Sequence, residues 1–315
     1  MLHFLLRRGA LIVPTLFGVT VIVFLMLQIV PGDPVNSILP PDASQVDRQK
    51  IIEQLGLNKP LYIQYFDWLL HVMHGDFGRS IIKRIAVNEL LFEGLRNTLI
   101  LSAAAGVLSF GLSIVIGVYS AYRPKSWIAS LANIIGLTGV TIPNFWAALI
   151  LVGVFSVMLG WLPSSGMSRI GGGDALDVMY HLILPSIAAG MTTLGIMTRM
   201  VRSTVYDILQ QDFVTTLRAK GAGSYTVLLH VLKNGAPTIL TVAGLQFGYL
   251  LGGSVLVETV FSWPGVGSLI YQAISQRDFP VIQAGVLVIA VLFVCLNLIV
   301  DMIHGMIDPR VRHTA

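Results

Sequence analysis

Three ionisable residues, Asp174, Asp177 and His181, are spaced so that a helix would carry them on one face. Two carboxylates and an imidazole are ligands that a divalent metal ion can use. In a simpler interpretation, the acids complement the positive end of a helix dipole and the histidine sits at a wet interface. Three-residue ligand patterns are common by chance, so the simpler interpretation is favoured and no metal site is predicted.

Other patterns that carry catalytic chemistry are scarce. The sequence contains no GxxxxGK[ST] phosphate loop, no HExxH zinc pattern and no GxSxG nucleophile elbow. Its single cysteine, Cys295, excludes an internal disulfide and any multi-cysteine metal site. We therefore assign no catalytic residue, and we expect a chain that binds no cofactor and makes or breaks no bonds itself.

The composition indicates which solvent surrounds the chain. Of its 315 residues, 55% are hydrophobic and only 11% are charged, and the mean hydropathy is +0.78. These values are typical of a polytopic membrane protein rather than a soluble domain. The net charge of +4 does not indicate nucleic-acid binding, because the basic residues are dispersed between apolar segments and better fit membrane headgroups and topology.

Six apolar runs are long enough to cross about 30 Å of hydrocarbon as helices, which takes roughly 20 residues. The predicted fold is therefore all-α, with six transmembrane helices. The approximate spans are Leu11 to Val30, Leu99 to Tyr122, Ile134 to Leu159, Tyr180 to Met200, Thr238 to Val260 and Val281 to Ile303.

The distribution of lysine and arginine predicts the orientation of these spans. Short cytoplasmic connections carry an excess of basic residues, so both termini are expected in the cytoplasm. The two short outside loops then hold only Arg169 and Arg277. The inside segments hold Arg7, Arg8, Arg123, Lys125, Arg199, Arg202, Arg218, Lys220, Lys233, Arg310 and Arg312.

The long outside segment, residues 31–98, has the signals of a folded helical region. One helix is predicted from Ser44 to about Leu55, and Pro60 suits the first turn of a second helix that ends before Gly75. The second helix carries the aromatic residues Tyr62, Tyr65, Phe66 and Trp68. These side chains would line a small core or, more simply, rest at the outer membrane interface.

The fifth predicted span carries a ridge of glycines and one acid. Gly244, Gly248 and Gly252 recur every four residues, which lets another helix approach closely. That helix belongs either to the same chain or to a partner, or the ridge lines a pathway. Glu258 lies near the outer end of the span, where an ionisable group normally faces a wet cavity or a partner. It is therefore a candidate pathway residue, unless it merely reaches the outer interface.

Between the fourth and fifth spans, the sequence predicts a helical elbow. Residues from Gln210 to Lys220 can form one short helix, Gly221 and Gly223 permit a bend, and Ser224 can cap a second helix through about Lys233. A basic loop that is merely anchored at anionic headgroups is the alternative.

The elbow "QDFVTTLRAKG", followed by "VLKNGAP", resembles the cytoplasmic EAA loop of ABC importer permeases, and specifically the branch that serves peptides and nickel. The resemblance covers nearly the whole chain and is carried by "LLRR", "VPGDPV", "LGLNKPLYIQY", "GDFGRS", "PNFW", "HLILPS", "GLQFGYLLGGSVLVETVFSWPGVG", "RDFPVIQAGVL" and "DPRVR". Three positions depart from the family pattern. Gln211 replaces an acid, Leu217 replaces a small alanine, and Pro237 stands one residue early after Asn234.

The resemblance implies a permease half of the type I importer kind in a bacterial inner membrane. Its segments would be residues 1–30, the outer segment 31–98, and a five-helix core 99–315 with a coupling loop at about 207–235. The residues that would couple to an ATPase are Asp212, Thr216, Arg218, Ala219, Lys220 and Gly221.

The implied partners are a homologous permease subunit, two cytoplasmic ATPase subunits that carry ATP and magnesium, and an extracytoplasmic solute-binding protein, together with membrane lipid. Two other classes remain open: a secondary transporter that works alone, and an intramembrane enzyme using Asp174, Asp177 and His181. Within the family, the expected solute is a di- or oligopeptide, with nickel chelate or glutathione as alternatives.

Overall fold

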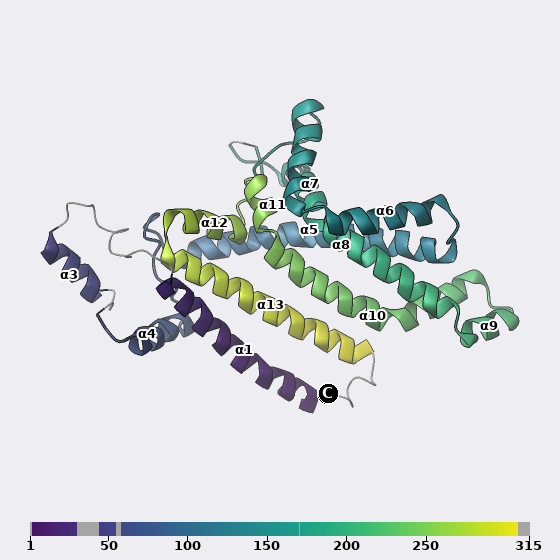
Figure 1. Cartoon of the computed structure of the whole chain (residues 1–315), viewed down its shortest axis with the longest axis horizontal. Coiled ribbons are helices and arrows are strands. Elements are labelled where there is room, and N and C mark those ends of the chain that lie inside the picture. The colour runs from purple at the N-terminus through teal and green to yellow at the C-terminus, as the bar shows by residue number, and fades with distance from the viewer. Residues whose placement is uncertain (1, 30–43, 55–57, 170, 308–315) are drawn as a thin grey trace. The chain divides into compact units, whose positions relative to one another are not determined.

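The computed structural model describes residues 2–29, 44–54, 58–169 and 171–307, and they are overwhelmingly helical (Figure 1). One isolated bridge joins Arg79 and Ala86. The "VPGDPV" and "DPRVR" motifs lie outside the described residues. The predicted helix end at Leu55 and Gly56 lies outside them as well. The helices are α1 Leu2–Ile29, α3 Gln45–Gln54, α4 Leu61–Met73, α5 Val87–Tyr122, α6 Trp127–Thr141, α7 Asn144–Leu151, a π-helix Val152–Met158, α8 Ala175–Leu209, α9 Asp212–Ala219, α10 Ser224–Gly253, α11 Val255–Val260, α12 Val266–Gln276 and α13 Phe279–Ile307.

These helices form two compact units. The first comprises residues 1–8, 99–263 and 295–315, and the second comprises residues 9–98 and 264–294. The three consecutive segments predicted from the sequence are defined by membrane topology, and they stay a prediction. The continuous helices α1, α5 and α13 contribute residues to both units.

Four stretches are long and apolar enough to cross a membrane: Val87–Tyr122, Ala175–Leu209, Ser224–Val260 and Phe279–Ile303. The bent pair α6 and α7 makes a fifth if it counts as one span. The first predicted span corresponds to α1, a helix of 28 residues, and the part of it with described side chains, Ile12–Met26, is apolar. The six predicted spans are consistent with these helices. Within the described residues, four or five helical stretches are long and apolar enough to be membrane spans.

The prediction of one continuous third span from Ile134 to Leu159 is wrong. Helix α6 starts earlier, at Trp127, and ends at Thr141, and the chain turns by 108° before the helical stretch Asn144–Met158. Proline disfavours helical geometry in the residue before it, and Ile142, which precedes Pro143, is accordingly extended (φ −85°, ψ 121°). Hydropathy alone does not detect such a break inside an apolar run.

In the second unit, the two predicted outer helices are confirmed as α3, beginning just after Ser44, and α4, ending before Gly75. The α4 aromatics differ in burial, and only the predicted small core is seen. Tyr65 is buried, and its hydroxyl lies 2.9 Å from the Thr20 hydroxyl of α1, while its ring and that of Trp68 pack against Phe24. In contrast, Tyr62 and Phe66 are exposed.

A buried carboxylate, that of Asp278, joins two distant segments within the second unit. Asp278, which follows α12, accepts hydrogen bonds from the Ser80 hydroxyl and from the backbone N–H groups of Ile81 and Ile82. It is only 3% exposed. The "GDFGRS" and "RDFPV" motifs, nearly two hundred residues apart in the sequence, are therefore fastened to each other.

In the first unit, α6 and α8 cross with almost no side chain between them. A β-carbon on Gly139 would lie 2.6 Å from the carbonyl oxygen of Met191, and one on Gly195 would lie 3.0 Å from the carbonyl oxygen of Ile135. Such close approach of two backbones requires glycine. This crossing holds α8 in place, and α8 leads directly into the predicted elbow.

Candidate functional site

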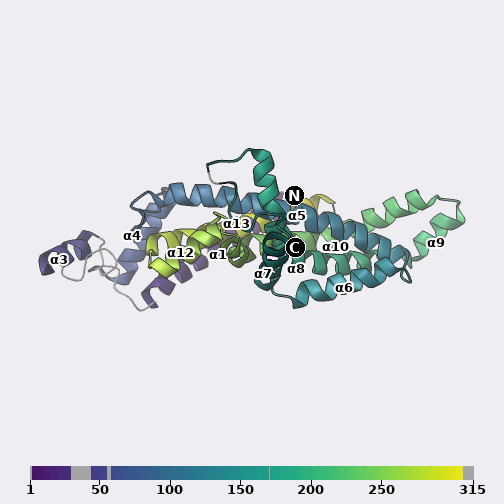
Figure 2. The same cartoon turned by 90° about the horizontal axis from the view of Figure 1, so that it is seen from above.

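The elbow is a short helix, α9, between the ends of α8 and α10, and it lies beyond both of them in two views (Figures 1 and 2). Its apolar side anchors it. Val214 is fully buried against Val205 and Ile208 of α8 and Val227 and Val231 of α10. The elbow therefore moves with the ends of two long helices rather than as a free loop.

A glycine terminates α9 as the sequence predicts. Gly221 has φ +81°, in the left-handed region, and no heavy atom lies within 4 Å of the position of an added β-carbon. The Ala222 N–H donates to the carbonyl of Leu217 and the Gly221 N–H donates to that of Arg218, both at 3.0 Å. This bonding is the Schellman motif, in which a glycine satisfies the last carbonyls of a helix. The bend predicted at Gly221 is thus confirmed, and glycine is favoured there by the positive φ and not by a crowding neighbour.

The predicted coupling residues lie together on the outward side of this elbow. The structure brings them close on one short element and leaves each of them exposed: Asp212, Thr216, Arg218, Ala219, Lys220 and Gly221. The departure at Gln211 falls on the N-cap of α9, where its side chain makes no capping hydrogen bond. The departure at Leu217 falls on the anchored side, packed against the same core as Val214.

The predicted second elbow helix is wrong in its boundaries. Gly223, not Ser224, is the N-cap, and α10 continues past Lys233 to Gly253 without interruption. Pro237 lies inside this helix rather than in its first turn. Membrane helices tolerate internal proline because local groups satisfy the backbone that it frees. The predicted second elbow helix and the fifth span are thus one continuous helix, α10.

The glycine ridge of α10 packs partly within the chain. A β-carbon on Gly244 would lie 2.4 Å from the Val300 side chain of α13, whereas one on Gly252 would meet no heavy atom within 4 Å. Gly248 is buried. Glu258, in α11, has no exposed surface and accepts a hydrogen bond from the Ser254 hydroxyl at 2.9 Å. Its role in a pathway stays a prediction.

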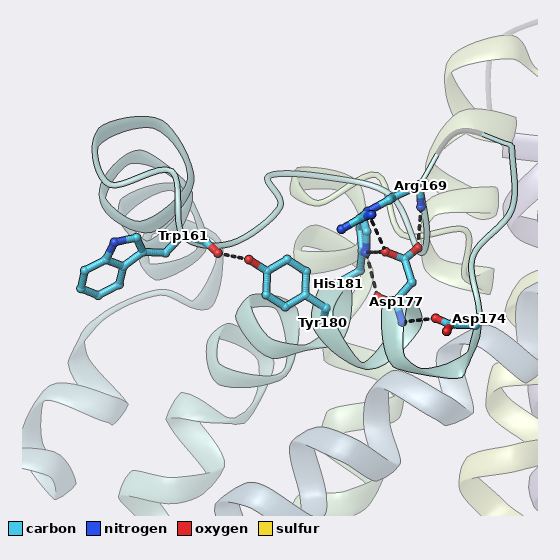
Figure 3. A network of polar contacts seen from close by, with 6 residues as sticks. All are labelled: Trp161, Arg169, Asp174, Asp177, Tyr180 and His181. Carbon is cyan, nitrogen blue, oxygen red and sulfur yellow. Dashed lines mark hydrogen bonds and ion pairs between the residues drawn. The ribbon is translucent and has the colours of Figure 1, made fainter.

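The three residues considered first as metal ligands have individual structural partners (Figure 3). Asp174 is the N-cap of α8 and accepts a hydrogen bond from the Asp177 N–H at 2.9 Å. The Asp177 carboxylate accepts the Arg169 N–H at 2.7 Å and lies 3.3 Å from the Arg169 Nε. His181 is buried, with Nδ1 at 2.9 Å from the Asp177 carbonyl oxygen.

Together these contacts fasten the preceding loop to the first turns of α8, and the Tyr180 hydroxyl adds a bond to the Trp161 carbonyl. No group of three or more potential metal ligands occurs within the described ranges. The capping part of the simpler interpretation is confirmed, but His181 is buried rather than at a wet surface.

Sequence reasoning missed the glycines at the crossing of α6 and α8. Their signal was present: Gly136 and Gly139 fall on one side of a helix, and Gly195 lies in the middle of the next long helix. It also missed the polar partners Thr192 and Asn144, whose side chains form a 2.7 Å hydrogen bond that ties α8 to α7. No pattern within a single segment indicates that pair.

Known proteins resemble the chain along its whole length. Residues 113–313 match the family described as binding-protein-dependent transport system inner membrane component, and residues 1–86 match the N-terminal domain of such membrane components. An oligopeptide transport system permease protein, AppB of Bacillus subtilis, is 40% identical over 99% of this chain and 100% of its own length. A dipeptide transport permease of Alkalihalophilus pseudofirmus and a glutathione transport permease of Salmonella typhimurium are each 38% identical, with the same coverage.

Among solved structures, the MetNI methionine ABC transporter in an inward-facing conformation has the same fold, with a TM-score of 0.55 and 18% identity over 70% of this chain and 96% of the matched chain. The predicted class, an all-α polytopic membrane protein of the type I importer kind, is thereby confirmed. Because the family model covers well over half of the residues and the relatives match from end to end, this chain belongs to the inner membrane components of binding-protein-dependent transport systems, the permease subunits of ABC importers.

Proposed function

We propose that the chain is one half of the membrane pathway of an ATP-driven importer for di- or oligopeptides. The observation that carries this proposal is the elbow: the short helix α9, anchored on its apolar side and joined to α10 by the turn at Gly221, presents Asp212, Arg218 and Lys220 to the solvent. Two relatives, named as oligopeptide and dipeptide transport system permease proteins, match this chain over their full length.

The remaining parts of the importer would come from partners. A homologous permease would complete the pathway as a heterodimer, and each elbow would be held by one of two cytoplasmic ATPase subunits that bind ATP and magnesium. A binding protein outside the membrane would deliver the solute. This chain would itself catalyse no reaction, in keeping with its lack of a nucleotide-binding motif.

Uptake by the reconstituted complex tests this function. Proteoliposomes that hold the chain with its co-purified subunits and binding protein are expected to accumulate a labelled peptide only when ATP is supplied on the ATPase side. Glutathione and chelated nickel serve as competing solutes, since a glutathione transport permease is as similar as the dipeptide one. Accumulation by this chain alone, without ATP, would instead establish a secondary transporter.

The proposed orientation, with both termini in the cytoplasm of an inner-membrane protein, has its own test. A cysteine in place of Asp47, in α3, is expected to react with a membrane-impermeant thiol reagent added outside intact cells, and one in place of Gly223 is expected to react only after the membrane is opened. The background chain is Cys295→Ser, because Cys295 is exposed. The opposite pattern of labelling would reverse the topology, and the elbow would then face away from any cytoplasmic ATPase.

A further inference from the structure

A groove of about 600 Å³ lies between the middle of α6 and the last third of α8, within the first unit. Its lining includes two arginines and several side chains that can form hydrogen bonds. The polar residues that line it are Asn133, Thr198, Arg199, Arg202, Ser203 and Tyr206. None of them belongs to the elbow or to the network around Asp177, so the groove is a separate feature.

Two positive charges in the groove have no acidic partner. Arg199 and Arg202 lie three residues apart and so share one side of α8. Arg202 donates to the side-chain oxygen of Asn133 and, at 3.4 Å, to the carbonyl of Ala129, which holds its guanidinium between the two helices. Within the described part of the chain, neither arginine forms an ion pair. The positive charge is therefore available to an anion.

The position along α8 places these charges at a membrane surface. With a rise of 1.5 Å per residue, a helix of this length spans about 52 Å, whereas the hydrocarbon layer takes about 30 Å. The predicted fourth span ends at Met200, so Arg199 lies in its last turn and Arg202 lies just beyond it. Trp127, which begins α6 on the other side of the groove, is exposed, as expected of a residue in the interfacial belt.

An exposed apolar strip leads away from the groove along α6. Its members, Ile134, Leu137 and Val140, are each about half exposed or more, and Leu137 also lines the groove. Paired arginines beside an apolar strip match a phosphate attached to acyl chains better than a free phosphate ion. We propose that the α6–α8 groove binds the headgroup phosphate of an anionic phospholipid, with Arg199 and Arg202 as its cationic ligands.

The chain, purified together with the subunits that accompany it, provides the test. Binding of short-chain phosphatidylglycerol, phosphatidylcholine and inorganic phosphate is measured by native mass spectrometry and by shifts in melting temperature. Phosphatidylglycerol is expected to bind, with about a five-fold loss of affinity in Arg199→Gln and about a thirty-fold loss in the double variant with Arg202→Gln, at roughly 1 kcal/mol per basic residue. Lys233→Gln is the matched control, because this exposed lysine of α10 does not line the groove.

Several results would overturn the proposal. Equal binding of phosphatidylcholine, or undiminished phosphatidylglycerol binding in the double variant, would remove the role of the two charges. Binding of inorganic phosphate as tight as that of the lipid would make this a site for free anions. A cysteine at Ser203 that cross-links to the homologous permease would make the groove a subunit contact.

If the double variant does not assemble, Arg199→Gln alone provides the test, because Arg199 is exposed and forms no hydrogen bond or ion pair with the part of the chain that the structure describes. The binding measurement does not depend on transport. Assignment of the headgroup to the cytoplasmic leaflet does rest on the proposed orientation, which the labelling experiment checks separately.

Discussion

Gly139→Ala is expected to force α6 away from α8 and to lower the yield of folded protein sharply. The added carbon would lie 2.6 Å from the carbonyl oxygen of Met191 and 3.1 Å from the Cα of Gly195. Both neighbours are backbone atoms, so no side-chain rotation relieves the overlap and one helix must shift. Overpacking of this kind costs typically 1–3 kcal/mol and occasionally more, and we expect about 3 kcal/mol here.

The measurement is the melting temperature and membrane abundance of the complex, compared with Gly111→Ala. Gly111 is also inside a long helix, α5, but no heavy atom lies within 4 Å of its added carbon. Alanine is a better helix former than glycine, so this control is expected to be neutral or slightly stabilising. Equal behaviour of the two variants would show that the crossing tolerates separation and does not position α8.

Much of this architecture follows from local chemistry. Serine, proline and glycine signals are sufficient to place the start of α3, both ends of α4 and the end of α9, because caps and turns depend on residues next to one another. Gly221 is the clearest case, since a helix that turns back within two residues needs a positive φ, and its value of +81° agrees with that requirement.

Other features depend on contacts between distant segments and were not predictable. Nothing near Ser80 in the sequence indicates that its hydroxyl donates to Asp278, and the close approach of Gly139 to Met191 becomes visible only when both helices are placed. The prediction of the third span was wrong for a different reason. An apolar run satisfies a hydropathy window on both sides of Pro143, although the chain turns by 108° there.

Gly221→Val is expected to uncouple the elbow while leaving the membrane-embedded helices intact. No atom crowds Gly221, so valine brings no clash, only the conformational cost of a β-branched residue at φ +81°. That cost is about 1–2 kcal/mol or more, which reduces the population of the correct turn by about tenfold. The Schellman bonds to Leu217 and Arg218 would then be lost, and Arg218 and Lys220 would be presented at a different angle.

The contrast that isolates this cause is Gly221→Asn. Asparagine adds a side chain of similar size but tolerates the left-handed region, so it is expected to retain most of the function. Co-purification of ATPase subunits and ATP-driven peptide uptake, measured at equal membrane abundance, should fall about tenfold for valine and much less for asparagine. Because α10 runs without a break from Ser224 to Gly253, the turn at Gly221 joins α9 directly to the helix that continues as the fifth span. Wild-type values for the valine variant would mean that the turn is not the element that transmits motion, and a basic loop resting on lipid headgroups would then explain Arg218 and Lys220 better.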